Sequence, residues 1–316
     1  MMPRSPRRTA FAPDTSSAAH SSGDIIDAER YRPRLFGIAY RMLGDVQDAE
    51  DLVQETLLRW HQVDREAVTT PEAWLVSVVT RLAIDRLRRT ATERAAYPGP
   101  WLPEPIADER YAADRTTELA SDLSMAFLVL LERLAPDERA AFLLREVFDA
   151  DYDEIARTLD KSPAAARQTV HRARARVRTD RTRFSASNDE KERLFTRFVS
   201  ALESDDKEGM LALLAPTVTF TSDGGGKAAA ARRVVHGSER ISRMLLNIEV
   251  KHAHPFTYRI ARVNGEPAMV SYFGGVVFAV TFFETDGDRI YGLYRVMNPD
   301  KLTHVESRAG GIQSAI

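Results

Sequence analysis

The spacing of apolar residues changes near Asp189, and this change divides the chain into two parts. Before that point, apolar residues recur every three or four positions, as in amphipathic helices. Beyond it, after two further helical stretches, they alternate along short runs that are typical of strands. We therefore expect a multidomain protein in which helical modules come first and an α+β domain follows.

The helical part consists of two blocks joined by a linker. Helices are predicted throughout residues 24–92 and again throughout residues 118–184. Residues 93–117 lie between them and hold Pro98, Pro100, Pro103 and Pro105, which favour an extended segment. Residues 1–23 are basic at first and then rich in Ser, Ala and Pro, so we expect a disordered leader and not a signal peptide.

Composition excludes several kinds of site. The 316 residues include no cysteine, which rules out disulfides and thiolate metal sites. No apolar run approaches the length of a membrane span, and we expect a cytoplasmic protein without a membrane partner. No residue spacing predicts a bound metal or cofactor. The net charge of −2 does not by itself indicate a polyanionic partner.

The first helical block contains two helices of different character. Residues 48–60 place their apolar side chains on one stripe, which leaves an acidic, amide-bearing surface. After the polar loop 61–70, Pro71 is well placed to open a second helix over residues 72–89. That helix ends in Arg86, Arg88 and Arg89, which suits its dipole.

The second block predicts a helix-turn-helix. Residues 152–159 form a short helix, residues 160–161 a turn, and Ser162 a cap for the helix that begins at Pro163. Eight basic residues lie between 167 and 183, against Asp180 as the only acid. A basic second helix behind a tight turn is typical of a duplex-DNA reader.

The last block predicts helices over residues 189–204, 207–214 and 237–247. Strands are expected over residues 217–221, 256–263, 268–273, 276–284 and 289–297. Asn264-Gly265 and Asp286-Gly287 are favoured hairpin turns. The pattern indicates an antiparallel meander that curls over its helices, an α+β arrangement.

Several strings in the helical part resemble those of extracytoplasmic-function sigma factors. Residues 48–56 are similar to the polymerase-binding helix of that family, and residues 74–75 with 81–89 to its promoter-melting helix. Residues 152–156 and 162–174 are similar to its second DNA-binding module. Together these strings span residues 26–183 in the family's order, and jointly they are specific. The resemblance implies core RNA polymerase and promoter DNA as partners, with a duplex upstream element and a melted downstream element.

Three further strings resemble the sigma-J-like subgroup, in which a SnoaL-like domain, a cystatin-like cone, follows the two all-α sigma modules. They are Trp101-Leu102-Pro103-Glu104-Pro105, Asp223-Gly224-Gly225-Gly226-Lys227 and Asn298-Pro299-Asp300-Lys301-Leu302. The resemblance assigns residues 24–92 to sigma region 2, 118–184 to region 4, 189–306 to the SnoaL-like domain and 307–316 to a tail. It implies that the fused domain regulates the sigma modules in cis.

The resemblance and the residue chemistry together give three sets of candidate residues. The polymerase-binding set is Asp48, Asp51, Gln54 and Glu55. The DNA-binding set is Arg81, Arg86, Arg88, Arg89, Ser162, Arg167, Gln168, His171, Arg172 and Arg174. The regulatory contacts are Trp101, Pro103, Glu104, Asp223, Gly225, Lys227, Asn298, Pro299 and Asp300.

Plainer interpretations stand beside these. The acidic face of residues 48–55 is also what an ordinary solvated surface looks like. Trp74 could stack on a flipped base, but its spacing with apolar neighbours favours the helix core. The loop 61–70 could hold such a base. The glycines of 224–226 could cradle a phosphate, although a hinge loop is the commoner use.

Two other functions remain open from the sequence alone. A helix-turn-helix regulator with a ligand-sensing domain leaves the helix at 48–60 unexplained. An enzyme needs an acid–base set inside the cone, for which the sequence offers Glu284 and Asp288, while His236, His252 and His254 form neither a triad nor a metal site. A small ligand of the C-terminal domain stays unidentified.

Overall fold

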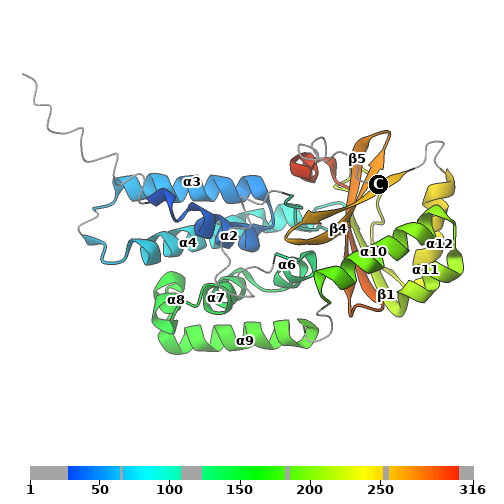
Figure 1. The fold of residues 1–316 in the computed structure, drawn as a ribbon. Coiled ribbons are helices and arrows are strands. Elements are labelled where there is room, and N and C mark those ends of the chain that lie inside the picture. The colour runs from blue at the N-terminus through cyan, green and yellow to red at the C-terminus, as the bar shows by residue number, and fades with distance from the viewer. Residues whose placement is uncertain (1–27, 65–66, 108–122, 182–185, 252–255, 306–316) are drawn as a thin grey trace, which may run out of the picture.

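The computed structural model describes residues 28–64, 67–107, 123–181, 186–251 and 256–305 (Figure 1). The expected leader and tail, as well as His252 and His254, lie outside the described residues. The side chains of residues 178–181 and 248–251 are likewise not described.

The long helices that the structure describes in the first helical module are α2 (Arg32–Leu43), α3 (Val46–Gln62) and α4 (Pro71–Ala95). Gly44 has a φ of 67° and ends α2 in the left-handed region, which glycine adopts readily. Asp45 then caps α3 by accepting the N–H of Asp48. The two predicted helices are present, and α4 continues beyond the expected Arg89 to Ala95.

The second helical module holds α6 (Met125–Leu131), α7 (Pro136–Glu146), α8 (Tyr152–Leu159) and α9 (Pro163–Arg181). Asp151 caps α8, and Asp160 turns the chain with a φ of 53°. The Ser162 hydroxyl accepts the N–H of Ala165 at 3.2 Å, as the sequence predicts for a cap of α9. Helices α8 and α9 therefore form the predicted helix-turn-helix.

The two helical modules are packed against each other. They contribute to the same buried apolar cluster, which includes Leu35, Phe36 and Val79 from the first module and Phe127, Leu128, Phe142 and Val177 from the second. Polar contacts cross the same boundary: Arg139 of α7 donates to the carbonyl of Met42 at 2.5 Å, and Glu132, after α6, pairs with Arg94 of α4 at 2.6 Å. This arrangement of the modules is called the closed form below.

The C-terminal domain combines three helices with a six-stranded sheet. Its elements are α10 (Asn188–Glu203), α11 (Lys207–Leu213), β1 (Leu214–Asp223), β2 (Val235–His236), α12 (Ser238–Lys251), β3 (Thr257–Val263), β4 (Glu266–Phe273), β5 (Val276–Thr285), β6 (Ile290–Val296) and a short 3₁₀ helix, η4 (Pro299–Lys301). The strand order is β2-β1-β6-β5-β4-β3. Strands β3 to β6 form the predicted antiparallel meander.

The sequence leaves the pairing of the strand at 217–221 open. Strand β1 pairs in parallel with β6, and the two-residue β2, which the sequence does not predict, pairs with the other edge of β1. After β2, α12 and the strands β3 to β5, the last strand β6 lies beside β1 and runs in the same direction. Hairpin signals in the sequence do not reveal such a pairing. The fold class, an α+β SnoaL-like cone behind two helical modules, is as expected.

The two faces of the sheet have different neighbours (Figure 1). On one face, α10 to α12 build a core in which the ring of Phe195 stacks on Phe283 at 3.8 Å. On the other face, Leu102 of the linker, Met125 of α6 and Leu302 pack on strand residues. The C-terminal domain thus uses the outer face of its sheet to contact the linker and the second module.

Candidate functional site

The predicted base-reading residues are exposed at the start of α9. Arg167, Gln168 and His171 all point into solvent behind the Ser162 cap. The guanidinium of Arg167 lies 5.4 Å from the centre of the Tyr152 ring on α8, a cation–π contact that restricts its orientation. The sequence had not singled out Tyr152.

The later arginines of α9 are tied to α7. Arg174 pairs with Glu146 at 2.5 Å, and Arg172 and Arg176 both pair with Glu138, at 3.6 and 2.7 Å. The hydrogen bonds that Arg174 donates to Glu146 raise the pKa of Arg174. These side chains therefore support the packing of α9 on α7, a role that the sequence had not predicted.

The arginines of α4 are engaged within the protein as well. Arg81 donates to the carbonyls of Thr158, at 2.9 Å, and Arg157, at 2.5 Å, at the C-terminal end of α8. A guanidinium there complements the negative end of the helix dipole. Further along α4, Arg86 forms an ion pair with Asp48, Arg88 pairs with Asp137 at 2.7 Å, and Arg89 is exposed.

The expected polymerase-binding face lies on α3. Asp51 and Gln54 are exposed, and Glu55 pairs with Arg59 at 2.8 Å. Asp48 differs because its carboxylate is held by Arg86 of α4. Leu58, which the sequence analysis missed, is 53% exposed on the same helix.

Trp74 packs within the first module. Its ring lies 5.4 Å from that of Trp60, and it is partly buried against the apolar cluster shared by the two modules. The core interpretation of Trp74 is therefore favoured over a stacking platform. Residues 65–66 of the neighbouring loop lie outside the described residues.

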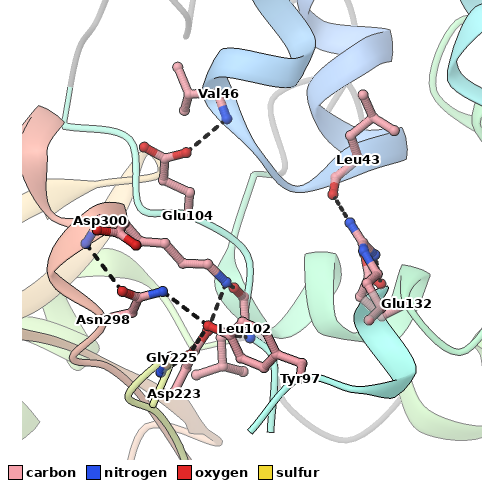
Figure 2. A network of polar contacts seen from close by, with 12 residues as sticks. Leu43, Val46, Tyr97, Leu102, Glu104, Glu132, Asp223, Gly225, Asn298 and Asp300 are labelled. Atoms are coloured by element: carbon pink, nitrogen blue, oxygen red, sulfur yellow. Dashed lines mark hydrogen bonds and ion pairs between the residues drawn. The ribbon is translucent and has the colours of Figure 1, made fainter. Parts of the chain in front are cut away.

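The three subgroup strings meet at a buried carboxylate, that of Asp223 at the end of β1 (Figure 2). Its Oδ1 accepts the hydroxyl of Tyr97 at 2.6 Å and the N–H of Gly225 at 3.0 Å. Its Oδ2 accepts the N–H of Leu102 at 2.9 Å and the Nζ of Lys301 at 2.8 Å. One side chain thus connects the linker, the glycine loop and the segment after β6.

Lys301 is the buried cation of this site. Its Nζ also donates to the Leu102 carbonyl at 2.6 Å and lies 4.1 Å from the centre of the Trp101 ring. Burial lowers the pKa of Lys301, and the adjacent Asp223 opposes that shift. The same Trp101 ring is contacted at 4.0 Å by Arg94 of α4. Trp101 therefore lies between a cation of the first module and a cation of the C-terminal domain.

The glycine loop and the Asn298 string fit each other closely. Asn298 caps η4 through the N–H of Asp300 and donates to the Tyr97 hydroxyl at 3.0 Å, with Pro299 as the first residue of η4. Gly225 has a φ of 59°, and a Cβ there would collide with the amide of Asn298. Lys227 and Asp300 form an exposed ion pair at 2.5 Å. The glycines of this loop thus allow a close backbone approach to Asn298, and the loop is packed against the segment after β6.

The linker is also anchored on the first module. The buried carboxylate of Glu104 accepts the N–H of Val46 at 2.9 Å, and its other oxygen lies 3.5 Å from His304 (Figure 2). The hydroxyl of Tyr40 on α2 donates to the Glu104 carbonyl at 2.6 Å. Burial is the main cause that raises the pKa of Glu104, to about 7.

Other neighbours modify the Glu104 site. The N–H of Val46 and the Lys301 cation act against the rise of the Glu104 pKa, and Asp45 adds to it. A Cβ at Gly44 would meet the Trp101 ring and Pro103, so the α2–α3 turn needs glycine at this position. The linker string is therefore held between the first module and the C-terminal domain.

The remaining candidates do not form a catalytic centre. Glu284 accepts the Tyr294 hydroxyl at 2.8 Å, while Asp288 and His236 are exposed. Within the described residues, no group of three or more His, Asp or Glu side chains is arranged to hold a metal ion. No helix in the described part of the chain is long and apolar enough to cross a membrane.

The raised pKa of Glu104 predicts a pH dependence of linker docking. A carboxyl whose pKa is raised on docking binds its proton more tightly in the docked state, so docking is strongest below the ordinary value of 4.5 and weakens as the pH rises toward about 7. The loss of docking free energy over this pH range amounts to about 3 kcal/mol. Glu104→Gln keeps an acceptor for Val46 but does not titrate. Thermal unfolding from about pH 5 to about pH 8 should give a flatter pH profile for this variant, and equal slopes would contradict the assignment.

Comparisons with known proteins agree with this architecture. The family model of Sigma-70 region 2 matches residues 28–93, and that of Sigma-70, region 4 matches residues 124–177. The ECF RNA polymerase sigma factor SigJ of Mycobacterium tuberculosis is 36% identical over 293 residues, which cover 89% of this chain and 93% of SigJ. SigI of the same species is 29% identical over 292 residues, covering 89% of this chain and 95% of SigI.

The likeness to SigJ extends to the three-dimensional structure. The crystal structure of SigJ from Mycobacterium tuberculosis superposes with a TM-score of 0.69 at 35% identity, covering 89% of this chain and 98% of that chain. Relatives of this kind are transcription proteins and not enzymes. The chain therefore belongs to the extracytoplasmic-function family of sigma-70 factors, with a SnoaL-like domain behind regions 2 and 4.

Proposed function

We propose that the SnoaL-like domain regulates this sigma factor in cis by stabilising the closed form. As a sigma factor, the protein binds core RNA polymerase and promoter DNA, and we place it in the cytoplasm, where these partners are found. The observation that carries the proposal is the buried Asp223–Lys301 pair, which connects the linker to the C-terminal domain. The proposal has two parts: the closed form is inactive, and the C-terminal domain favours it.

The first part rests on Arg81. Its guanidinium is bonded to the carbonyl end of α8, and it cannot follow the phosphates of a melted strand while it remains there. Regions 2 and 4 are expected on separate promoter elements, downstream and upstream. In the closed form they share an apolar cluster, so contact with both elements requires the modules to separate.

The second part rests on the position of the linker. Trp101 and Glu104 contact the first module, and the backbone of Leu102, between them, is held by Asp223 and Lys301. The linker therefore cannot move away from the C-terminal domain without exposing a buried ion pair. Such a contact can switch if the free-energy gap between the two forms is a few kcal/mol.

Two carboxylates in this region provide a matched test. Asp223 is fully buried and Asp300 is about 60% exposed, and each pairs with a lysine. Asp223→Ala leaves a buried cation without its partner, which is expected to cost about 3–5 kcal/mol, whereas Asp300→Ala should cost about 1 kcal/mol or less.

Promoter-specific transcription with core polymerase measures the consequence. Asp223→Ala should raise the output at a limiting concentration of sigma factor, because a larger fraction of chains is open, while Asp300→Ala stays at the wild-type level. Near-ultraviolet circular dichroism checks that the domains remain folded. Equal output from all three proteins would mean that this contact does not regulate.

We propose further that the exposed part of α3 binds polymerase. Asp51, Gln54 and Glu55 are available on this face, with Leu58 beside them, while Asp48 serves mainly to hold Arg86. Acidic groups around an exposed apolar residue suit a basic partner surface with an apolar centre.

Charge reversal tests the polymerase face. The double variant Asp51→Lys and Glu55→Lys should weaken core binding at least tenfold and leave the unfolding temperature nearly unchanged, because exposed positions tolerate charge changes. The matched control is Glu93→Lys on α4, another exposed acid, which should keep wild-type affinity. A polymerase titration with unchanged affinity for the double variant would refute this assignment.

We propose that the start of α9 reads the upstream element. Arg167, Gln168 and His171 are exposed next to the capped helix end, and the Ser162 region is suited to bind a phosphate. Arg172, Arg174 and Arg176 contribute through phosphate charge and by holding α9 on α7.

The two groups of arginines predict different phenotypes. Arg167→Ala should relax the preference at one base pair by about 1–3 kcal/mol, because a bidentate contact to a guanine is lost. Arg176→Ala should weaken binding to all sequences by a similar factor and reduce the salt dependence. Binding to a panel of altered promoters separates the two outcomes. Identical profiles would show that this division of contacts is wrong.

A small ligand of the C-terminal domain would need a place outside the filled core between the sheet and its helices. The described residues form an open groove of about 320 Å³ between α10 and β3, lined by Val199, Tyr258 and Ile260 among others. We place such a ligand in this groove, beside the apolar core that includes Phe195.

A further inference from the structure

The first residue of the turn between β3 and β4, Asn264, is buried, although hairpin turns of this type usually face solvent. Asn264 and Gly265 have φ values of 55° and 75°, the pair of left-handed residues that a tight hairpin requires. Asn264 is nevertheless only 2% exposed. Gly265 is exposed and nothing lies within 4 Å of a Cβ built there, so it is the Asn264 side of the turn that contacts other parts of the chain.

The side chain of Asn264 satisfies three groups from three segments. Its Oδ1 accepts the N–H of Ile106 in the linker at 2.7 Å. Its Nδ2 donates to the Tyr40 hydroxyl on α2 at 3.1 Å and to the carbonyl of Leu123, just before α6, at 3.0 Å. The backbone N–H of Asn264 also donates to the Ile106 carbonyl at 2.7 Å. One residue therefore contacts the first module, the linker and the second module.

Tyr40 extends this contact. The Tyr40 side chain is fully buried, and its hydroxyl accepts from Asn264 and donates to the carbonyl of Glu104. Burial raises the pKa of Tyr40, so the group stays a neutral hydroxyl that can serve as donor and acceptor at once. The first module and the linker are thus connected to the hairpin tip through the same oxygen atom.

Glu266, at the first position of β4, reinforces the contact to the second module. Its Oε1 accepts the N–H of Met125 at the start of α6 at 2.8 Å, and its Oε2 pairs with Lys191 of α10 at 2.6 Å. A carboxylate at a helix N-terminus is favourable because it meets unsatisfied N–H groups and the positive end of the dipole.

The other tight hairpin of the sheet shows that this burial is not a requirement of the turn. The β4–β5 turn, Gly274-Gly275, has φ values of 60° and 82°, and nothing lies within 4 Å of a Cβ built at either position. Burying polar groups is favourable only when each finds a partner. The polar tip of β3–β4 is therefore specific to its three-way contact.

We propose that Asn264 is the positioning residue that couples the two sigma modules to the SnoaL-like domain, with Glu266 as its support. The proposal rests on the proposed regulation in cis and assigns its mechanical coupling to residues outside the three subgroup strings. The partners of Asn264 can be satisfied together only when both modules and the linker are in their closed positions. Movement of either module leaves buried groups of the other segments unpaired, so the release is cooperative.

The full-length chain allows a direct test because it contains no native cysteine. Gln62→Cys at the end of α3 and Ala164→Cys at the start of α9 are exposed positions, one in each module, for a pair of spin labels or fluorophores. Asn264→Gly keeps a residue that accepts the positive φ and removes the side-chain contacts. Gly274→Asn is the matched control, because Gly274 is the first residue of the exposed β4–β5 turn and has a φ of 60° against 55° for Asn264.

A second variant tests the same contact from the opposite side. Tyr40→Phe removes only the hydroxyl and leaves the C-terminal domain unchanged, so a folding defect of Asn264→Gly cannot decide the outcome. We expect both variants to shift the distance distribution to longer values and to raise the apparent affinity for core polymerase at least threefold, while Gly274→Asn matches the wild type. The double variant should have less than the sum of the two single effects, because both single variants remove the hydrogen bond between Asn264 and Tyr40.

The outcomes separate this inference from the proposed regulation. A wild-type distance distribution in both Asn264→Gly and Tyr40→Phe, together with an opened distribution in Asp223→Ala, would overturn the coupling role of Asn264 and leave regulation in cis intact. If none of the three variants opens the chain, both proposals fail.

Discussion

Burial of the Asp223 carboxylate is the constraint on which the arrangement of the domains depends. A charge removed from water needs a cation and hydrogen-bond donors around it. Asp223 obtains them from Lys301, Tyr97, Leu102 and Gly225, which come from three separate segments. The linker must therefore lie on the C-terminal domain for the charge to be satisfied. The position of the linker in turn brings the first module, through Trp101 and Glu104, to the same junction.

The local elements could be predicted from the sequence because their signals are local. The capped helix-turn-helix, the acidic helix α3 and the hairpins at Asn264-Gly265 and Asp286-Gly287 each depend on residues a few positions apart. The parallel pairing of β1 with β6 could not be predicted in this way. It joins residues about 70 positions apart, such as Phe220 and Leu293, and no single-sequence pattern records such a pairing.

The candidate sites were predictable to a different extent. The three subgroup strings pointed to residues that do lie together, but the strings did not identify which side chain is the centre of the contact. Tyr97 and Asn264 were missed because a tyrosine after a helix and an Asn-Gly turn are ordinary surface features in a sequence. Their function depends on burial against segments that are more than 100 residues away. The arginines of α4 were identified by charge, and their partners within the protein became evident only from the packing of the modules.

The DNA-binding role that we propose for Arg81 has a consequence for promoter binding. The carbonyl end of α8 and a nucleic-acid backbone are both acceptors for the same guanidinium, so they compete for it. Promoter DNA would then destabilise the closed form in addition to being the target of the protein. A substitution that stabilises the closed form is then expected to lower the affinity for promoter DNA, even when the substituted residue does not contact DNA. Selection against transcription without a signal and selection for promoter affinity would therefore act on the same equilibrium, the one between the closed and the open form.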